Sequence, residues 1–128
     1  MNYEKWAFHD ISPISQQLIQ KLKYAILSNE LSCGEGIPSV REMAEWLHIN
    51  PNTVLKSYKV LKQEQLIICS TGRKYFVTQD RAYVQQIKQD TINELCCSYL
   101  SQMFALGFNK QEAIEKLQIY CDKLNCHK

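Results

Sequence analysis

Apolar residues recur at helical spacing in the first quarter of the chain. They stand four residues apart and predict one helix with a single buried stripe, formed by Ile14, Leu18, Leu22 and Ile26. Ser12 is a favourable N-cap, and Pro13 suits the first helical position because proline has no N–H to leave unpaired there. The helix should end near Ser28 and Asn29, before a glycine-containing turn at residues 33–36. The residues before it form an arm that Trp6 and Phe8 can anchor.

Two further helices follow, separated by a tight turn at residues 48–49. Ser39 and Glu42 fit a capping box, in which each side chain bonds the backbone N–H of the other residue. Asn50 is a good N-cap, and Pro51 again occupies a first helical position. We expect the core-facing side chains to be Val40, Met43, Ala44 and Leu47, and then Val54, Tyr58 and Leu61. The last helix would then present to solvent Asn52, Thr53, Leu55, Lys56 and Lys59.

The pattern then changes to short runs typical of strands. Residues 66–69 and 75–78 predict two strands, joined by a turn with a basic tip at residues 70–74. Three helices followed by a hairpin form a winged helix-turn-helix. Beyond Asp80 the pattern is helical only. A long helix begins near Arg81 and ends at Gly107, and Asn109 caps a last helix with Glu112 completing a second capping box.

Each of these last two helices carries an apolar stripe that no second layer of the chain covers. The stripes are Ile92, Leu95, Tyr99, Met103 and Leu106, and Ala113, Leu117, Cys121 and Leu124. Such faces must be buried, most simply against another copy, so we expect a C2 homodimer. The alternative is a monomer in which the helices fold back on the winged domain.

The fold class predicted is therefore mainly α with a small β-hairpin. It comprises a winged helix-turn-helix domain at residues 1–79, whose first 11 residues form the arm, and a two-helix C-terminal dimerisation region at residues 80–128. The length of 128 residues suits one small domain with such an appendage. The 45% hydrophobic and 22% charged fractions are those of a soluble globular protein. No apolar run reaches the roughly 18–20 residues needed to cross a bilayer, and the N-terminus lacks a secretion signal. We expect a cytoplasmic protein with no membrane partner.

Charge is distributed unevenly along the predicted winged domain. Residues 51–77 contain five basic residues and one acid, whereas residues 30–50 contain four acids and Arg41 alone. A basic stretch beside an acidic one indicates an oriented surface, which suits a phosphate backbone. The N–H groups at a helix N-terminus also favour phosphates. Asn52 and Thr53 can bond base edges or phosphates in the major groove, and Lys56 and Lys59 suit phosphates better than bases.

The motifs PSVREMA at residues 38–44 and NPNTV at residues 50–54, with the later Leu61 and Leu66-Ile67, resemble the DNA-binding domain of the GntR family of bacterial regulators. The short helical tail is similar to that of the YtrA-like subfamily. The resemblance implies a dimeric repressor of a double-stranded DNA operator, modulated by a small-molecule effector of unknown identity. It implies that Arg41 reads a base and that the remaining DNA-binding residues are Ser39, Asn50, Asn52, Thr53, Lys56, Gly72 and Arg73. In place of residues typical of the family, this chain has Gly36-Ile37, Gln65 and Lys74.

Simpler explanations compete at several positions. Arg41 could pair with Glu45 one helical turn further on, and the lysines could form a solvated face. Most of the six cysteines are expected to be small buried hydrophobic residues, because no CxxC motif occurs and Cys96 and Cys97 are adjacent. Redox or soft-metal sensing through the cysteines Cys96, Cys97, Cys121 and Cys126, with His127, is the alternative. A winged-helix module that binds protein is another.

An enzyme is not expected. The three histidines are scattered along the chain, and no phosphate-binding glycine loop or nucleophile–base spacing is found. We therefore predict no catalytic residues, no cofactor and no metal site.

Overall fold

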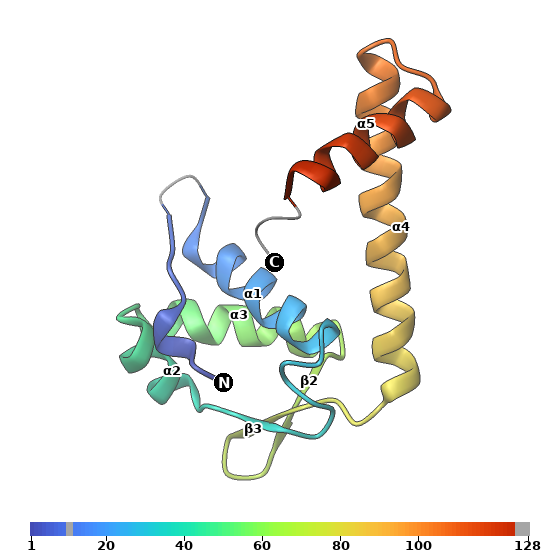
Figure 1. Ribbon diagram of the computed structural model, residues 1–128. Helices are drawn as coiled ribbons and strands as arrows, with labels where there is room; N and C mark the ends of the chain where they lie inside the picture. The colour runs from blue at the N-terminus through green and yellow to red at the C-terminus, as the bar shows by residue number, and fades with distance from the viewer. Residues whose placement is uncertain (10–11, 125–128) are drawn as a thin grey trace. The chain divides into compact units, whose positions relative to one another are not determined.

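The computed structural model describes residues 1–9 and 12–124 (Figure 1). The chain divides into two compact units, residues 1–87 and 88–128. The division falls inside one continuous helix, α4 (Arg81–Ala105), so the first turns of α4 belong to the first unit. The domain boundary drawn from the sequence, between residues 79 and 80, precedes this helix and stays a prediction.

The first unit is mainly helical with a small sheet, as the sequence predicted. A short 3₁₀ helix, η1 (Tyr3–Lys5), precedes α1 (Ile14–Leu27) and β1 (Gly36–Ile37). The helices α2 (Val40–Leu47) and α3 (Pro51–Gln63) follow, and then the strands β2 (Ile67–Ser70) and β3 (Lys74–Val77). Figure 1 shows α1 lying along α3 with α2 beside them.

The core of this unit lies among the three helices and the sheet. The predicted stripes are buried at Leu18, Leu22 and Ile26 of α1 and at Val54, Tyr58 and Leu61 of α3, all with at most 1% of their surface exposed. Burial of each large aliphatic side chain contributes about 1.5–3 kcal/mol. Ile14, the first member of the α1 stripe, is instead 40% exposed. The four-residue spacing therefore identified the face of α1, although not its outer end.

The start of α1 differs from the prediction. The helix begins at Ile14 with Pro13 as its N-cap, rather than with Ser12 as N-cap. The Gln17 side chain takes over the bonding of the preceding backbone: its Nε2 donates to the carbonyls of Ser12 (2.8 Å) and His9 (2.7 Å), and its Oε1 accepts from the His9 N–H (3.0 Å). These bonds fix the backbone that leads into α1, and in the described residues no side chain caps the first-turn N–H groups of this helix.

The arm is anchored chiefly by a residue that the sequence analysis did not select. Tyr3 is 6% exposed and stacks on Trp46 of α2, with ring centroids 6.2 Å apart. Trp6 meets the Tyr3 ring edge-on at 5.2 Å, and Trp6 and Phe8 pack against the core while partly exposed. The burial of Tyr3 raises the pKa of its phenol to about 12. The expected aromatic anchoring is present, with Tyr3 at its centre.

The sheet has three strands rather than the two of the predicted hairpin. Its order is β1-β3-β2, and both pairings are antiparallel. Strand β1 pairs Gly36 with Phe76 and Ile37 with Tyr75. A strand of two residues is too short to show alternation, so β1 could be found only from its tertiary pairing. The two strands that were predicted each lie within one residue of their expected bounds.

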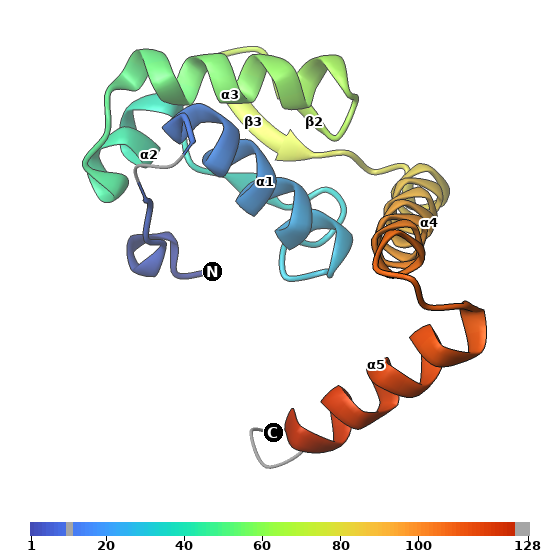
Figure 2. The ribbon, with the colours of Figure 1, turned by 90° about the horizontal axis from the view of Figure 1, so that it is seen from above.

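The second unit consists of the rest of α4 and α5 (Lys110–Leu124). Gly107 adopts a φ of +96° after α4, and the predicted capping box is present, with Asn109 Oδ1 accepting from the Glu112 N–H at 2.8 Å. Figures 1 and 2 show α5 running away from α4 rather than back along it. Near the corner, the Tyr99 hydroxyl donates to the Ala113 carbonyl at 2.8 Å. In the described residues, no helix is long and apolar enough to cross a membrane.

Candidate nucleic-acid interface

The turn between α2 and α3 is built by local backbone bonds. His48 adopts a left-handed φ of +56°, and the N–H of Ile49 donates to the Ala44 carbonyl at 3.1 Å. Asn50 is the N-cap of α3, as predicted, and its Oδ1 accepts from the Asn52 N–H at 2.8 Å. With these bonds, α2 ends and α3 begins within three residues of each other. The first turn of α3 therefore emerges at the surface.

The leading edge of α3 is exposed while its underside is fixed in the core. Asn52 and Lys56 are exposed and Thr53 is partly exposed, whereas Val54 is fully buried. The Tyr58 hydroxyl donates to the Pro38 carbonyl at 2.8 Å, which ties α3 to the segment before α2. Burial raises the pKa of Tyr58 above its usual range, so this hydroxyl remains a donor. The geometry on which the sequence interpretation depends is present.

Ser39 and Arg41 occupy the beginning of α2. The capping box is present: Ser39 Oγ accepts from the Glu42 N–H and Glu42 Oε1 accepts from the Ser39 N–H, both at 3.1 Å. Arg41 is exposed, and within residues 1–9 and 12–124 no hydrogen bond or ion pair engages its side chain. The alternative pairing with Glu45 is therefore absent. The guanidinium is available to a ligand.

The two helices and the hairpin together line one groove. This wing groove has a volume of about 660 Å³ and is lined by Ser39, Val40, Arg41, Pro51, Leu55, Arg73 and Tyr75. A neighbouring hollow of about 420 Å³ includes Ser39, Gly72 and Arg73. Four predicted residues, namely Ser39, Arg41, Gly72 and Arg73, thus come together at these two hollows. The other four, which line neither hollow, lie at the start of α3: Asn50, Asn52, Thr53 and Lys56.

The tip of the hairpin carries an arginine in an unusual conformation. Gly72 and Arg73 have φ values of +81° and +60°, between the cross-strand pair Ser70 and Lys74. A Cβ at position 72 would meet nothing within 4 Å, so the tip is open and Gly72 serves the turn rather than packing. The left-handed conformation costs a non-glycine residue about 1–2 kcal/mol. Residues with strained backbone conformations are concentrated at functional sites. Here the left-handed conformation belongs to Arg73, at the tip of the hairpin.

Sequence reasoning missed Tyr75 and Val40 as lining residues of the wing groove. The Tyr75 ring meets that of Tyr58 edge-on, with centroids 4.8 Å apart, so it is held by the core on one side. Burial raises the pKa of Tyr75 above its ordinary value. The only local signal for Tyr75 was its place beside the basic Lys74 on a short strand. Its contact with Tyr58 of α3 depends on the fold.

Two helices joined by a tight turn, an exposed polar edge on the second and a basic wing define a winged helix-turn-helix DNA-binding protein. The family described as bacterial regulatory proteins of the gntR family matches residues 14–77, so the chain belongs to the GntR family of transcription regulators. The predicted resemblance to YtrA-like members is likewise confirmed.

Three relatives illustrate this similarity. The chain is 28% identical to the transcriptional regulator YhcF of Bacillus subtilis, over 90% of this chain and 95% of that protein. It is 39% identical to the B. subtilis transcriptional repressor YtrA, over 54% of this chain and 53% of that one. A GntR family regulator from Listeria monocytogenes has a similar structure, with a TM-score of 0.83 and 29% identity over 87% of this chain and 97% of its own.

Proposed function

We propose that the protein is a cytoplasmic, dimeric repressor that binds a double-stranded DNA operator and responds to a small-molecule effector. The observation that carries the proposal is the exposed first turn of α3, whose underside is buried at Val54 and Tyr58. A helix held in this way can enter the major groove without distorting the core. The similarity to the YtrA repressor supports repression as the outcome.

The proposed DNA-binding residues divide by the part of the DNA that each would contact. The unpaired Arg41 can form the bidentate contact with guanine O6 and N7 that arginine favours in the major groove. Lys56 and the capped start of α2 at Ser39 face the phosphate backbone. Asn52 and Thr53 supply further hydrogen bonds from α3. Arg73, at the open tip of the hairpin, is suited to a narrow and electronegative minor groove.

The exposed apolar surface of the second unit supports the homodimer. Its large exposed side chains include Ile92, Leu95, Phe104, Leu106, Ile114, Leu117, Tyr120 and Leu124. Ala113 is the buried residue of α5. Large apolar side chains exposed in this number on two helices are typical of a protein interface. A C2 dimer would cover it and place two DNA-reading heads on a near-palindromic site.

Selection of bound fragments from the source genome tests the DNA-binding role and yields the operator. On that operator, Arg41→Ala should reduce discrimination between matched and mismatched sites by about 1–3 kcal/mol. Lys56→Ala should weaken all sequences similarly and lower the salt slope by about one unit. Lys110→Ala, on α5, is the matched control and should change neither. An affinity that barely responds to salt would instead indicate a protein-binding module.

Sedimentation at several concentrations tests the dimer. Leu117→Glu places a charge on the apolar face of α5 and should shift the protein to monomer. Ile119→Glu introduces the same charge at an exposed position on the other side of the helix and should leave the dimer intact. A wild-type monomer at micromolar concentration, or equal effects of the two substitutions, would contradict this interface.

A second candidate, redox sensing, is favoured by the exposure of three cysteines. Cys96, Cys97 and Cys121 are exposed, and Cys33 and Cys69 are only partly buried, so the expectation that most cysteines are buried is wrong for the described residues of the single chain. Among the described residues, no cluster of three His, Cys, Asp or Glu side chains could hold a metal ion. Cys126 and His127 lie outside the described residues. Operator affinity unchanged by diamide, with and without replacement of all cysteines by serine, would exclude redox sensing.

A further inference from the structure

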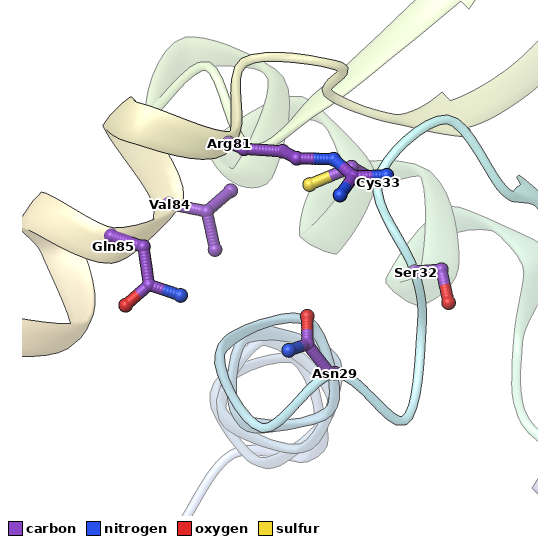
Figure 3. A pocket seen from close by; sticks show the side chains of 6 residues that line it. All are labelled: Asn29, Ser32, Cys33, Arg81, Val84 and Gln85. Atoms are coloured by element: carbon purple, nitrogen blue, oxygen red, sulfur yellow. The ribbon is translucent and has the colours of Figure 1, made fainter.

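A hollow of about 360 Å³ lies between the end of α1 and the beginning of α4, within the first unit (Figure 3). We call it the α1–α4 pocket, and it is lined by Asn29, Ser32, Cys33, Arg81, Val84 and Gln85. Its volume lies within the range of roughly 300–1,000 Å³ that is typical of small-molecule sites. It shares no residue with the wing groove, so any ligand here would not compete directly for the surface that faces DNA.

The walls of this pocket are held in place by the core of the unit. Val84 is 3% exposed and packs among the buried residues. The Tyr83 hydroxyl donates to the Glu64 carbonyl at the end of α3, and Asp80 Oδ1 accepts from the Tyr83 N–H at 3.0 Å. On the other wall, Asn29 adopts a left-handed φ of +68° directly after α1. The backbone of both walls is therefore held in place, while the polar side chains Asn29, Ser32, Arg81 and Gln85 are exposed.

Its polar lining combines the single positive charge of Arg81 with hydroxyl and amide groups, which can both donate and accept hydrogen bonds. Figure 3 shows the Arg81 side chain extending across the pocket towards the loop that carries Ser32 and Cys33. The amide groups of Asn29 and Gln85 face the same space. Among the described residues, no carboxylate lines the pocket. No hydrogen bond or ion pair within that part of the chain engages the side chains of its polar lining residues, Asn29, Ser32, Arg81 and Gln85.

We propose that the α1–α4 pocket binds a small carboxylate- or phosphate-bearing metabolite and is the effector site. The planar guanidinium of Arg81 can donate two parallel N–H bonds to an oxyanion. The amides of Asn29 and Gln85 supply further donors, while Val84 and Cys33 contact the less polar remainder of the ligand. The effector role rests on the proposed DNA-binding function, whereas anion binding does not.

The position of the pocket gives the ligand a direct way to act on the regulator. Arg81, Val84 and Gln85 lie on the first turns of α4, which continues without interruption to Ala105 in the second unit. A ligand that binds one arrangement of these turns more tightly than another increases the population of that arrangement of α4. Both units contain part of this helix. Operator affinity then depends on ligand concentration, although no ligand atom touches the DNA-facing residues.

Alkylation of Cys33 tests occupancy without DNA. Cys33 lines the pocket and is partly exposed, whereas the partly exposed Cys69 of β2 and the exposed Cys97 of α4 lie outside the pocket and serve as internal controls. Iodoacetamide labelling is followed for each cysteine by peptide mass spectrometry, at constant ionic strength. The probes are benzoate, phenyl phosphate and benzamide, the last being a neutral analogue of benzoate. At least one of the two anions should slow Cys33 labelling and leave the control cysteines unchanged, and comparison of the two identifies the preferred oxyanion. Benzamide should have no effect.

Two substitutions connect this protection to the pocket. Arg81→Gln should weaken the protecting anion by roughly tenfold or more, because it removes a charge-assisted hydrogen-bond pair. Asn29→Asp adds a repelling charge at nearly constant volume, in a residue type that tolerates left-handed φ, and should also abolish protection. Lys88→Gln removes one positive charge from α4 outside the pocket and should behave as wild type. Protection by neither anion, equal protection by benzamide, or unchanged protection in Arg81→Gln would overturn the proposed site.

Operator binding is measured separately, with and without the protecting anion. The anion should change operator affinity of the wild type and of Lys88→Gln, but not of Arg81→Gln. Cys33 protection without any change in operator affinity would overturn the effector role while leaving the anion site standing. Failure of the untreated protein to bind any DNA would instead overturn the proposed function, and Cys33 protection would still report on the pocket.

Discussion

Replacement of Gln65 by glycine should increase the stability of the protein. It follows the C-cap of α3 with a φ of +63°, and two backbone bonds define a Schellman motif around it. The Gln65 N–H donates to the Lys62 carbonyl and the Leu66 N–H to the Leu61 carbonyl, both at 3.0 Å. The residue at this position of the motif is usually glycine, because glycine has no Cβ to strain in the left-handed region. The side chain of Gln65 is exposed, so its removal leaves no cavity.

The expected gain follows from two opposing contributions. Relief of left-handed strain stabilises the folded state by about 1–2 kcal/mol. The larger conformational freedom of glycine in the unfolded chain opposes this by about 0.5–1 kcal/mol. We expect Gln65→Gly to raise the free energy of unfolding by about 1 kcal/mol, which corresponds to a Tm increase of about 4–8 °C for a unit of this size.

Thermal and urea unfolding at one fixed protein concentration measure this effect, because association alters apparent stability. Gln63→Gly is the matched control: the same residue type is replaced two positions earlier, at an exposed position in the last turn of α3. It should lower stability by about 0.5–1 kcal/mol. A Tm of Gln65→Gly at or below that of the wild type, or a rise in both variants, would refute the strain argument.

Three further outcomes follow from the structure. Ser39→Ala removes the side-chain half of the α2 capping box and should cost about 1 kcal/mol in urea unfolding. Gly107→Ala places a Cβ at a φ of +96° and should cost at least about 1–2 kcal/mol, with α5 helicity by circular dichroism as a second readout. Burial raises the pKa of Tyr58 above its ordinary value of 10, so the unfolded chain deprotonates first. Stability should therefore be full below about pH 10 and decline above it. Tyr58→Phe should be less stable at neutral pH because it lacks the hydrogen bond to Pro38, and its stability should decline less steeply above about pH 10. An equal decline in Tyr58→Phe would contradict the assignment.

Local signals predicted most of the first unit. The capping boxes at Ser39 and Asn109 and the cap at Asn50 are complete within a few residues, and each fixes a helix start. The four-residue stripes identify buried faces because the core covers one side of each helix. The start of α1 was misjudged: Pro13 rather than Ser12 is the N-cap, and the Gln17 side chain bonds the backbone that precedes the helix. A helix start can therefore be predicted from the local sequence where its cap is complete within a few residues.

The features that the sequence did not reveal depend on contacts between distant residues. Strand β1 exists because Gly36 and Ile37 pair with β3 some 40 residues later. Tyr3 becomes the anchor of the arm because Trp46 stands beside it. The candidate site was predicted as separate residues, and its assembly into a groove shared by Arg41 and Arg73 required the fold. The α1–α4 pocket likewise joins residues about 50 positions apart, and no periodicity marks it.

The uninterrupted helix α4 also limits which insertions and deletions the chain can accept. It contains no glycine or proline between Arg81 and Ala105, so it offers no point at which a kink would absorb an inserted residue. Each residue added or removed near the middle of α4 would advance everything beyond it by about 1.5 Å and rotate it by about 100°. A single deletion would thus turn Leu95 and its neighbours away from their present direction. Insertions that preserve assembly should therefore occur in multiples of seven, which return the helix face to within about 20° of its starting direction.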